Sequence, residues 1–177
     1  MTIFPPGRGP SRAVSFLADL SAPVLSLALA PLLNRVVEGL ARKHPSIFDR
    51  LGPHTATGYV IDATNLPFAL FLRPDPARPV LSAVARNSLP AHQALIRGSF
   101  DTLFELIDSD ADGDAVFFSR DLVIEGNTEA VVSLRNALDD VDGSIAADAA
   151  DLFGPPGRLA LGFLRGRAGA RNERTSS

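Results

Sequence analysis

The chain has 177 residues, 46% of them hydrophobic, which suits one domain that buries roughly two-thirds of its unfolded surface. It contains no cysteine, which excludes disulfides, thiolate catalysis and cysteine-ligated zinc. The net charge of −3 is unevenly distributed, because residues 99–157 hold 14 acidic and 2 basic residues while both flanking regions are net basic. An acidic centre argues against a nucleic-acid-binding protein, which concentrates positive charge on its core.

The N-terminal region is the most apolar part of the chain. Residues 1–12 are rich in proline and glycine and are predicted to be disordered, and residues 13–43 are predicted to form two or three short helices. The apolar run is interrupted at Asp19, Pro23 and Pro31. These interruptions argue against a membrane span, which needs about twenty continuous apolar residues. A secretory signal is the competing interpretation, because two arginines precede the run.

A domain is expected over residues 44–164, and its first part is rich in β-formers. The expected strands are Thr57 to Asp62, Phe68 to Leu72, Val80 to Val84, His92 to Ile96 and Leu122 to Glu125. The turn-rich link between the first two predicts an antiparallel hairpin, and a second turn is expected between Asn87 and Pro90. Consecutive strands followed by segregated helices indicate an α+β fold with an antiparallel or mixed sheet.

Two amphipathic helices are predicted, one between the fourth and the fifth strand and one directly after the fifth. Ser99 is the expected N-cap of a helix of about three turns, and Asn127 is the expected N-cap of a second, with Glu129 in its first turn. The first carries an apolar stripe at Phe100, Leu103, Phe104 and Ile107, and the second at Val131, Leu134, Leu138 and Val141. Arg135 and Asp139 are expected to turn away from the second stripe.

The C-terminal region is predicted to be less regular. A weaker helix is expected over Ile145 to Phe153, then a break at Pro155-Pro156-Gly157 and an apolar segment from Leu159 to Leu164. Residues 165–177 are rich in arginine and are predicted to be a disordered tail. Its positive charge would suit an anionic membrane surface, but a solvated, frayed tail is the favoured interpretation.

No residue pattern indicates catalysis or metal binding. Residues 108–114 match four positions of an EF-hand calcium loop, but Ser119 stands where the loop needs a bidentate glutamate. The three histidines lie in separate segments: His44, His54 and His92. No nucleophile elbow, phosphate-binding loop or dinucleotide-binding glycine pattern occurs. The sequence therefore predicts neither an enzyme nor a cofactor.

Apolar faces are more numerous than a small core requires. Besides the two helical stripes, they comprise the pair Phe117 and Phe118, the segment 13–40 and the segment 159–164. Each taken singly is explained by an ordinary core. Together they favour a lipid-sized cavity or a membrane-facing patch.

The segment 112–129, with the sequence DGDAVFFSRDLVIEGNTE, resembles the sterol carrier protein 2 lipid-transfer domain. More narrowly, it is similar to the bacterial accessory factors of ubiquinone biosynthesis that carry this domain. Agreement is close over residues 99–141 and looser at residues 35–40, and the proline-interrupted C-terminus departs from the pattern. The resemblance implies about five strands covered by helices that enclose an apolar lipid tunnel, with no catalytic residues. It also implies a role in the oxygen-independent branch of ubiquinone synthesis.

The resulting hypothesis is a non-enzymatic protein that holds polyprenylated quinone precursors and presents them to membrane-proximal hydroxylating partners. The residues expected to contact the lipid are Phe100, Leu103, Phe104, Ile107, Phe117, Phe118, Val131, Leu134 and Leu138. Expected partners also include phospholipid and a membrane surface, but no nucleic acid. The expected location is the cytoplasm, with peripheral contact at the inner membrane left open. The alternatives are a generic fatty-acyl or sterol carrier, and an interaction module that buries its apolar faces in a dimer or complex.

Overall fold

A five-stranded sheet forms the centre of the molecule. The computed structural model describes the backbone of residues 12–108, 121–141 and 143–175. The strands are β1 (Tyr59–Ala63), β2 (Ala69–Arg73), β3 (Val80–Val84), β4 (Ala94–Gly98) and β5 (Val123–Gly126). Their order in the sheet is β3-β2-β1-β4-β5. Each lies within two residues of the predicted strand.

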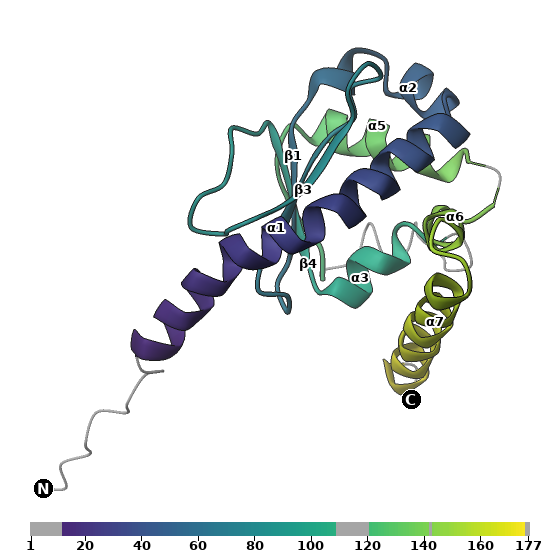
Figure 1. Cartoon of the computed structure of the whole chain (residues 1–177). Coiled ribbons are helices and arrows are strands. Elements are labelled where there is room, and N and C mark those ends of the chain that lie inside the picture. Colours follow the sequence, from purple (N-terminus) through teal and green to yellow (C-terminus); the bar gives the residue numbers. More distant parts are fainter. Residues whose placement is uncertain (1–11, 109–120, 142, 176–177) are drawn as a thin grey trace, which may run out of the picture.

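Helices gather on one side of this sheet (Figure 1). They are α1 (Arg12–Lys43), α2 (Ser46–Leu51), α3 (Phe100–Glu105), α5 (Thr128–Asp139), α6 (Ile145–Asp151) and α7 (Pro155–Thr175), with a 3₁₀ helix η1 (Gly52–Ala56). The C-terminal part of α1 runs along β3 at the sheet edge, and its N-terminal part projects beyond the sheet. The α+β class with helices covering the sheet is confirmed.

The sheet is mixed. The predicted hairpin is confirmed, since β1 pairs antiparallel with β2. The chain then passes from the edge strand β3 to β4, which pairs parallel with β1 on the other side. The turn expected at residues 87–90 therefore lies within a crossover connection and does not form a hairpin. The register places Ile61 opposite Leu70 and Ile96, so these three side chains share one face of the sheet.

Three of the helices that follow strand β4 begin at a side-chain cap: α3, α5 and α6. The Ser99 hydroxyl accepts a hydrogen bond from the Thr102 amide at 3.1 Å, and the Asn127 carboxamide accepts one from the Ala130 amide at 3.0 Å. Both predicted caps are confirmed, and Ser144 caps α6 in the same way. The helix after Ser99 is shorter than expected, because α3 spans six residues and ends in a turn.

The two terminal helices correct the sequence prediction. Residues 12–43 form one helix of 32 residues in place of two or three short ones. Each proline inside it removes one backbone donor, but the surrounding leucines and alanines are strong helix formers and the helix continues. The expected break at residues 155–157 is instead the start of α7, because proline is well tolerated in the first turn of a helix. Helix α7 extends to Thr175, where a disordered tail was expected.

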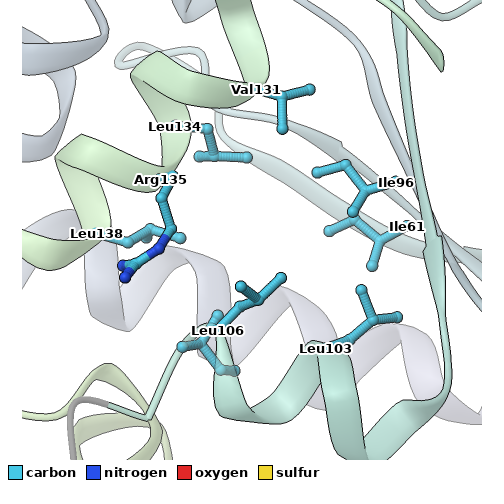
Figure 2. A pocket seen from close by; sticks show the side chains of 9 residues that line it. Ile61, Ile96, Leu103, Leu106, Val131, Leu134, Arg135 and Leu138 are labelled. Carbon is cyan, nitrogen blue, oxygen red and sulfur yellow. The ribbon is translucent and has the colours of Figure 1, made fainter. Parts of the chain in front are cut away.

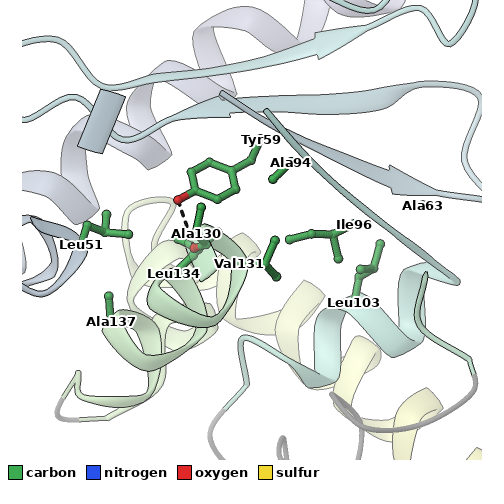
Figure 3. Packing of buried hydrophobic residues seen from close by; sticks show 10 residues of the cluster. All are labelled: Leu51, Tyr59, Ala63, Ala94, Ile96, Leu103, Ala130, Val131, Leu134 and Ala137. Atoms are coloured by element: carbon green, nitrogen blue, oxygen red, sulfur yellow. Dashed lines mark hydrogen bonds between the residues drawn. The ribbon is translucent and has the colours of Figure 1, made fainter. Parts of the chain in front are cut away.

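The main core packs α2, α3 and α5 against the sheet (Figure 3). Its buried members are Leu51, Tyr59, Ala63, Ala94, Ile96, Leu103, Ala130, Val131, Leu134 and Ala137. The Tyr59 hydroxyl is buried and donates a hydrogen bond to the Ala130 carbonyl at 3.2 Å, which ties β1 to α5. Burial raises the pKa of Tyr59 to about 12. This bond fixes the first turn of α5 over the sheet.

The opposite face of the sheet carries a smaller apolar cluster and one buried acid. The carboxylate of Asp62 accepts hydrogen bonds from Arg86 at 2.6 Å and from Arg97 at 2.9 Å. Burial alone would raise the pKa of Asp62, but these two guanidinium groups hold it below its ordinary value. The crossover connection is thereby attached to β1 and β4.

This carboxylate should make stability depend on pH. Because the folded state lowers the pKa of Asp62, its stabilisation is complete above about pH 5 and is lost as the pH falls through the folded pKa, below about pH 4. We expect Asp62→Asn to lower the melting temperature at pH 7 and to lose less further stability than wild type between about pH 5 and pH 3. Thermal unfolding across this range measures both. The exposed Asp49→Asn should follow the wild-type curve, and parallel curves for wild type and Asp62→Asn would contradict the assignment.

Candidate lipid-binding site

A wholly apolar cavity of about 240 Å³ lies between the sheet and the helices. The residues that line it are Val36, Val37, Leu40, Ala41, Ile47, Phe48, Ile61, Leu70, Leu72, Pro74, Pro79, Leu81, Ile107, Leu134, Leu138, Ile145 and Ala149. They come from α1, α2, α5, α6 and three strands. A water molecule inside would find no polar side chain to bond, so the cavity suits an apolar guest.

A second, smaller cavity of about 70 Å³ adjoins the first (Figure 2). Its lining is Ile61, Ile96, Leu103, Leu106, Ile107, Val131, Leu134, Arg135 and Leu138. Four of these residues also line the larger cavity: Ile61, Ile107, Leu134 and Leu138. The two cavities therefore share a wall between β1, α5 and the end of α3.

Strand alternation explains why the cavity is apolar. Side chains on one face of a strand recur every second residue, so Leu70 and Leu72 of β2 face the helices together with Ile61 of β1. Two lining residues on the helical side, Ala41 of α1 and Ala149 of α6, are small. The other side chains of the lining are larger and all apolar.

The structure brings together five of the nine residues that the sequence predicted as lipid contacts. Those in the lining are Leu103, Ile107, Val131, Leu134 and Leu138. Phe100 and Phe104 lie outside it and stack on each other, with ring centroids 6.1 Å apart. Phe117 and Phe118 lie outside the described residues. Whether any of these residues contacts a lipid remains a prediction.

None of the lining residues on the sheet or on α1 was among the predicted lipid contacts. The alternation of apolar side chains in β1 and β2 is the sequence signal that points to those on the sheet. One expectation about α5 was wrong. Arg135 does not turn away from the apolar stripe, because it lines the smaller cavity with a side chain only 11% exposed. Its guanidinium forms an ion pair with Asp139, one helical turn further along.

A polar junction lies beside Ile107, which lines both cavities and is 38% exposed. The next residue, Asp108, is buried and accepts hydrogen bonds from Arg165 of α7, at 2.7 and 2.8 Å, and from the Ser144 hydroxyl at 2.8 Å. This junction joins the end of α3 to α6 and α7. Asp108 is also the first residue of the segment 108–114, which resembles a calcium loop. Residues 109–114 of that segment lie outside the described residues.

A second polar junction attaches α6 to the end of α1. Asp148 forms an ion pair with Lys43 and a hydrogen bond with His44. Burial alone would raise the pKa of Asp148, but these two partners hold it below its ordinary value. Ala149, the next residue, lines the larger cavity. The junction therefore sets the position of α6 over that cavity.

Neither a group of metal-ligating side chains nor a helix able to span a bilayer occurs among the described residues. Among residues 12–108, 121–141 and 143–175, no three or more histidine, aspartate or glutamate side chains are grouped as metal ligands would be. Over the same residues, no helix combines the length and the hydropathy that crossing a bilayer requires.

The sequence model of the SCP-2 sterol transfer family matches residues 34–139, which is more than half of the chain. No curated protein matches the sequence. Solved structures with a similar fold include "UbiJ-SCP2 Ubiquinone synthesis protein", which is 14% identical with a TM-score of 0.47 over 66% of this chain and 90% of that one.

Two eukaryotic structures are also similar. Sterol carrier protein 2 from Yarrowia lipolytica is 13% identical, with a TM-score of 0.43 over 60% of this chain and 85% of that one. Sterol carrier protein domain 2 of Helicoverpa armigera is 14% identical, with a TM-score of 0.45 over 64% of this chain and 95% of that one. The family match covers the whole sheet and the helices α2, α3 and α5. The chain therefore belongs to the SCP-2 sterol transfer family and contains its lipid-binding domain.

Proposed function

We propose that this protein is a non-enzymatic lipid carrier for ubiquinone biosynthesis, which holds polyprenylated precursors and presents them to hydroxylating partners. The observation that carries this proposal is the apolar cavity of about 240 Å³ inside a lipid-binding domain. Each buried CH₂ group contributes about 0.8 kcal/mol. Three or four prenyl units would therefore give useful affinity without a single hydrogen bond. The resemblance of the segment 112–129 to quinone-pathway factors supports the assignment to this pathway.

The identity of the bound lipid provides the first test. The protein would be purified from cells that make ubiquinone, and its organic extract analysed by mass spectrometry. We expect a polyprenylated phenol or benzoate in the extract. Only fatty-acyl lipids or sterols would support a generic carrier, and a stable dimer by light scattering with no extractable lipid would support the interaction module.

Deletion of the gene tests the pathway. We expect ubiquinone to disappear under anoxic growth and to remain under oxic growth, because the proposed role lies in the oxygen-independent branch. Normal ubiquinone under both conditions would contradict this role while leaving lipid binding intact.

We also propose that the carrier contacts the membrane surface through α7. This helix exposes Leu159 and Phe163, which are 77% and 66% exposed and lie one turn apart. The Arg167 guanidinium carbon lies 5.9 Å from the centroid of the Phe163 ring. Residues 158–177 hold five arginines and one glutamate. Apolar side chains flanked by arginine suit the interface of an anionic bilayer.

The double variant Leu159→Ser/Phe163→Ser tests this contact. We expect its affinity for vesicles of phosphatidylglycerol and phosphatidylcholine to fall by at least about tenfold, because two large apolar side chains no longer enter the interface. Vesicle co-sedimentation at two salt concentrations measures the loss. Val123→Ser removes an apolar side chain that is 45% exposed on β5, away from α7, and serves as the control. Equal losses in both variants would contradict a specific role of α7.

A further inference from the structure

Helix α6 is the part of the cavity wall that lies outside the family domain. Its residues Ile145 and Ala149 line the larger cavity, whereas the family match ends at residue 139. All other residues that line this cavity lie between residues 36 and 138, inside the match. The helix contacts both the C-terminal end of α1 and α7 (Figure 1). This chain therefore completes its cavity with a segment that the family domain does not supply.

The apolar contacts that hold α6 in place are small. Four of its seven residues are alanine, and Ile145 is its one large apolar side chain. By contrast, α5 buries Val131 and Leu134 in the main core. A helix as short as α6 is not stable by itself in water. Its position therefore depends on contacts with the rest of the protein.

Polar contacts supply most of this attachment. Asp148, in the middle of α6, forms an ion pair with Lys43 and a hydrogen bond with His44 at the end of α1. The cap residue Ser144 donates a hydrogen bond to Asp108. Water can replace such polar contacts at moderate cost, whereas exposure of a large apolar side chain has no such compensation. Helix α6 can therefore move away while the main core stays folded.

Glycines in the left-handed conformation lie on both sides of this helix. Gly143 has a φ of 95° and Gly154 a φ of 63°. Glycine adopts many backbone conformations at little cost, so these two positions can absorb a rotation of the segment between them. That segment includes Leu152, whose side chain lies against Gly39 of α1. Leu152 therefore moves together with α6.

We propose that α6 is a lid over the larger cavity, which opens to admit and release the lipid tail and closes through the contacts of Asp148 with Lys43 and His44. This proposal rests on the proposed lipid-binding function and adds the route by which the ligand enters and leaves. The tail passes where Ile145 and Ala149 stand in the closed state. Opening of the lid then sets the rate of exchange in both directions.

Loss of the Asp148 charge should accelerate both uptake and release. The probe is a fluorescent lipid, farnesyl anthranilate, or cis-parinaric acid if only acyl chains bind. In Asp148→Asn the side chain keeps its size but no longer pairs with Lys43, so the open state becomes more populated. We expect uptake of the probe and its release to phosphatidylcholine vesicles to accelerate by about tenfold, the effect of one charge-assisted hydrogen bond. The affinity should change much less, because both rates rise together.

Stopped-flow fluorescence measures both rates. Asp140→Asn is the matched control, since it removes an ion pair with Arg50 that does not involve α6. This variant should exchange the probe at wild-type rates.

A disulfide should lock the lid, and it can be introduced cleanly because the chain has no cysteine. A Cβ atom at Gly39 would lie 3.3 Å from the Cγ atom of Leu152. The two side chains of Gly39→Cys/Leu152→Cys are therefore close enough for a disulfide. We expect the oxidised protein, loaded with the probe beforehand, to release it at least about tenfold more slowly than the same protein after reduction, because the bond blocks local opening. Mass spectrometry confirms that the bond has formed.

The outcomes separate the lid from lipid binding. If the oxidised and reduced proteins release the probe at equal rates, the lid is overturned while lipid binding stands. The same holds if Asp148→Asn leaves the rate of uptake unchanged, and this arm decides alone if the disulfide does not form. If wild type binds neither farnesyl anthranilate nor cis-parinaric acid, the proposed lipid-binding function fails, and the lid fails with it. Melting temperatures of all variants confirm that each is folded.

Discussion

Replacement of Ala149 by phenylalanine is expected to weaken lipid binding by at least about tenfold while leaving the melting temperature unchanged or raising it. Ala149 lies on α6 and lines the larger cavity, so an aromatic ring at this position would fill space that a lipid tail needs. Loss of two or more buried CH₂ contacts accounts for a tenfold change, at about 0.8 kcal/mol each. Filling an empty apolar void is stabilising where the ring fits, because it restores packing contacts.

The opposite signs of these two effects make the experiment diagnostic. A ring that merely disrupted α6 would lower both the affinity and the melting temperature. Ala77→Phe adds the same ring at an exposed site in the loop between β2 and β3, and should change neither quantity. Binding of a fluorescent lipid and thermal unfolding would be measured on all three proteins. Unchanged affinity in a stable Ala149→Phe protein would show that the ligand does not use the larger cavity.

Local signals in the sequence were sufficient to place the strands and the starts of α3, α5 and α6. The caps at Ser99 and Asn127 could be recognised because each needs only one side chain and an amide three residues away. The hairpin of β1 and β2 depends on one short turn. Such features are set by neighbours in the chain, so one sequence contains them fully.

Features that depend on distant residues could not be predicted in the same way. The parallel pairing of β1 with β4 joins segments more than thirty residues apart, and no turn encodes it. The contact of α1 with β3 likewise joins segments that are distant in the sequence. The cavity is lined by residues from helices, strands and loops that come together only in the folded chain. Arg135 was misplaced for the same reason, because an arginine on a helix is solvated unless tertiary contacts enclose it.

Loss of the Arg165 side chain is the second change expected to have a large effect. In Arg165→Met the carboxylate of Asp108 stays buried, retains its bond from Ser144 and loses the cation that donates to both of its oxygens. Removal of one partner from a fully buried ion pair costs about 3–5 kcal/mol. Because Arg165 is 35% exposed, we expect about 2–4 kcal/mol here. Urea unfolding followed by circular dichroism measures this loss.

The double variant Asp108→Asn/Arg165→Met separates loss of the ion pair from loss of packing. Asparagine still accepts a hydrogen bond from Ser144 but carries no charge, so the double variant should recover part of the stability that Arg165→Met loses. Additive losses in the two single variants would contradict the ion pair. The same junction joins α7 to the end of α3, next to the cavity-lining Ile107. We therefore expect trypsin to cleave after Arg158 faster in Arg165→Met than in wild type, because α7 opens locally once its attachment is lost. If the protein is destabilised but cleavage at Arg158 is unchanged, the ion pair contributes to global stability and does not set the position of α7.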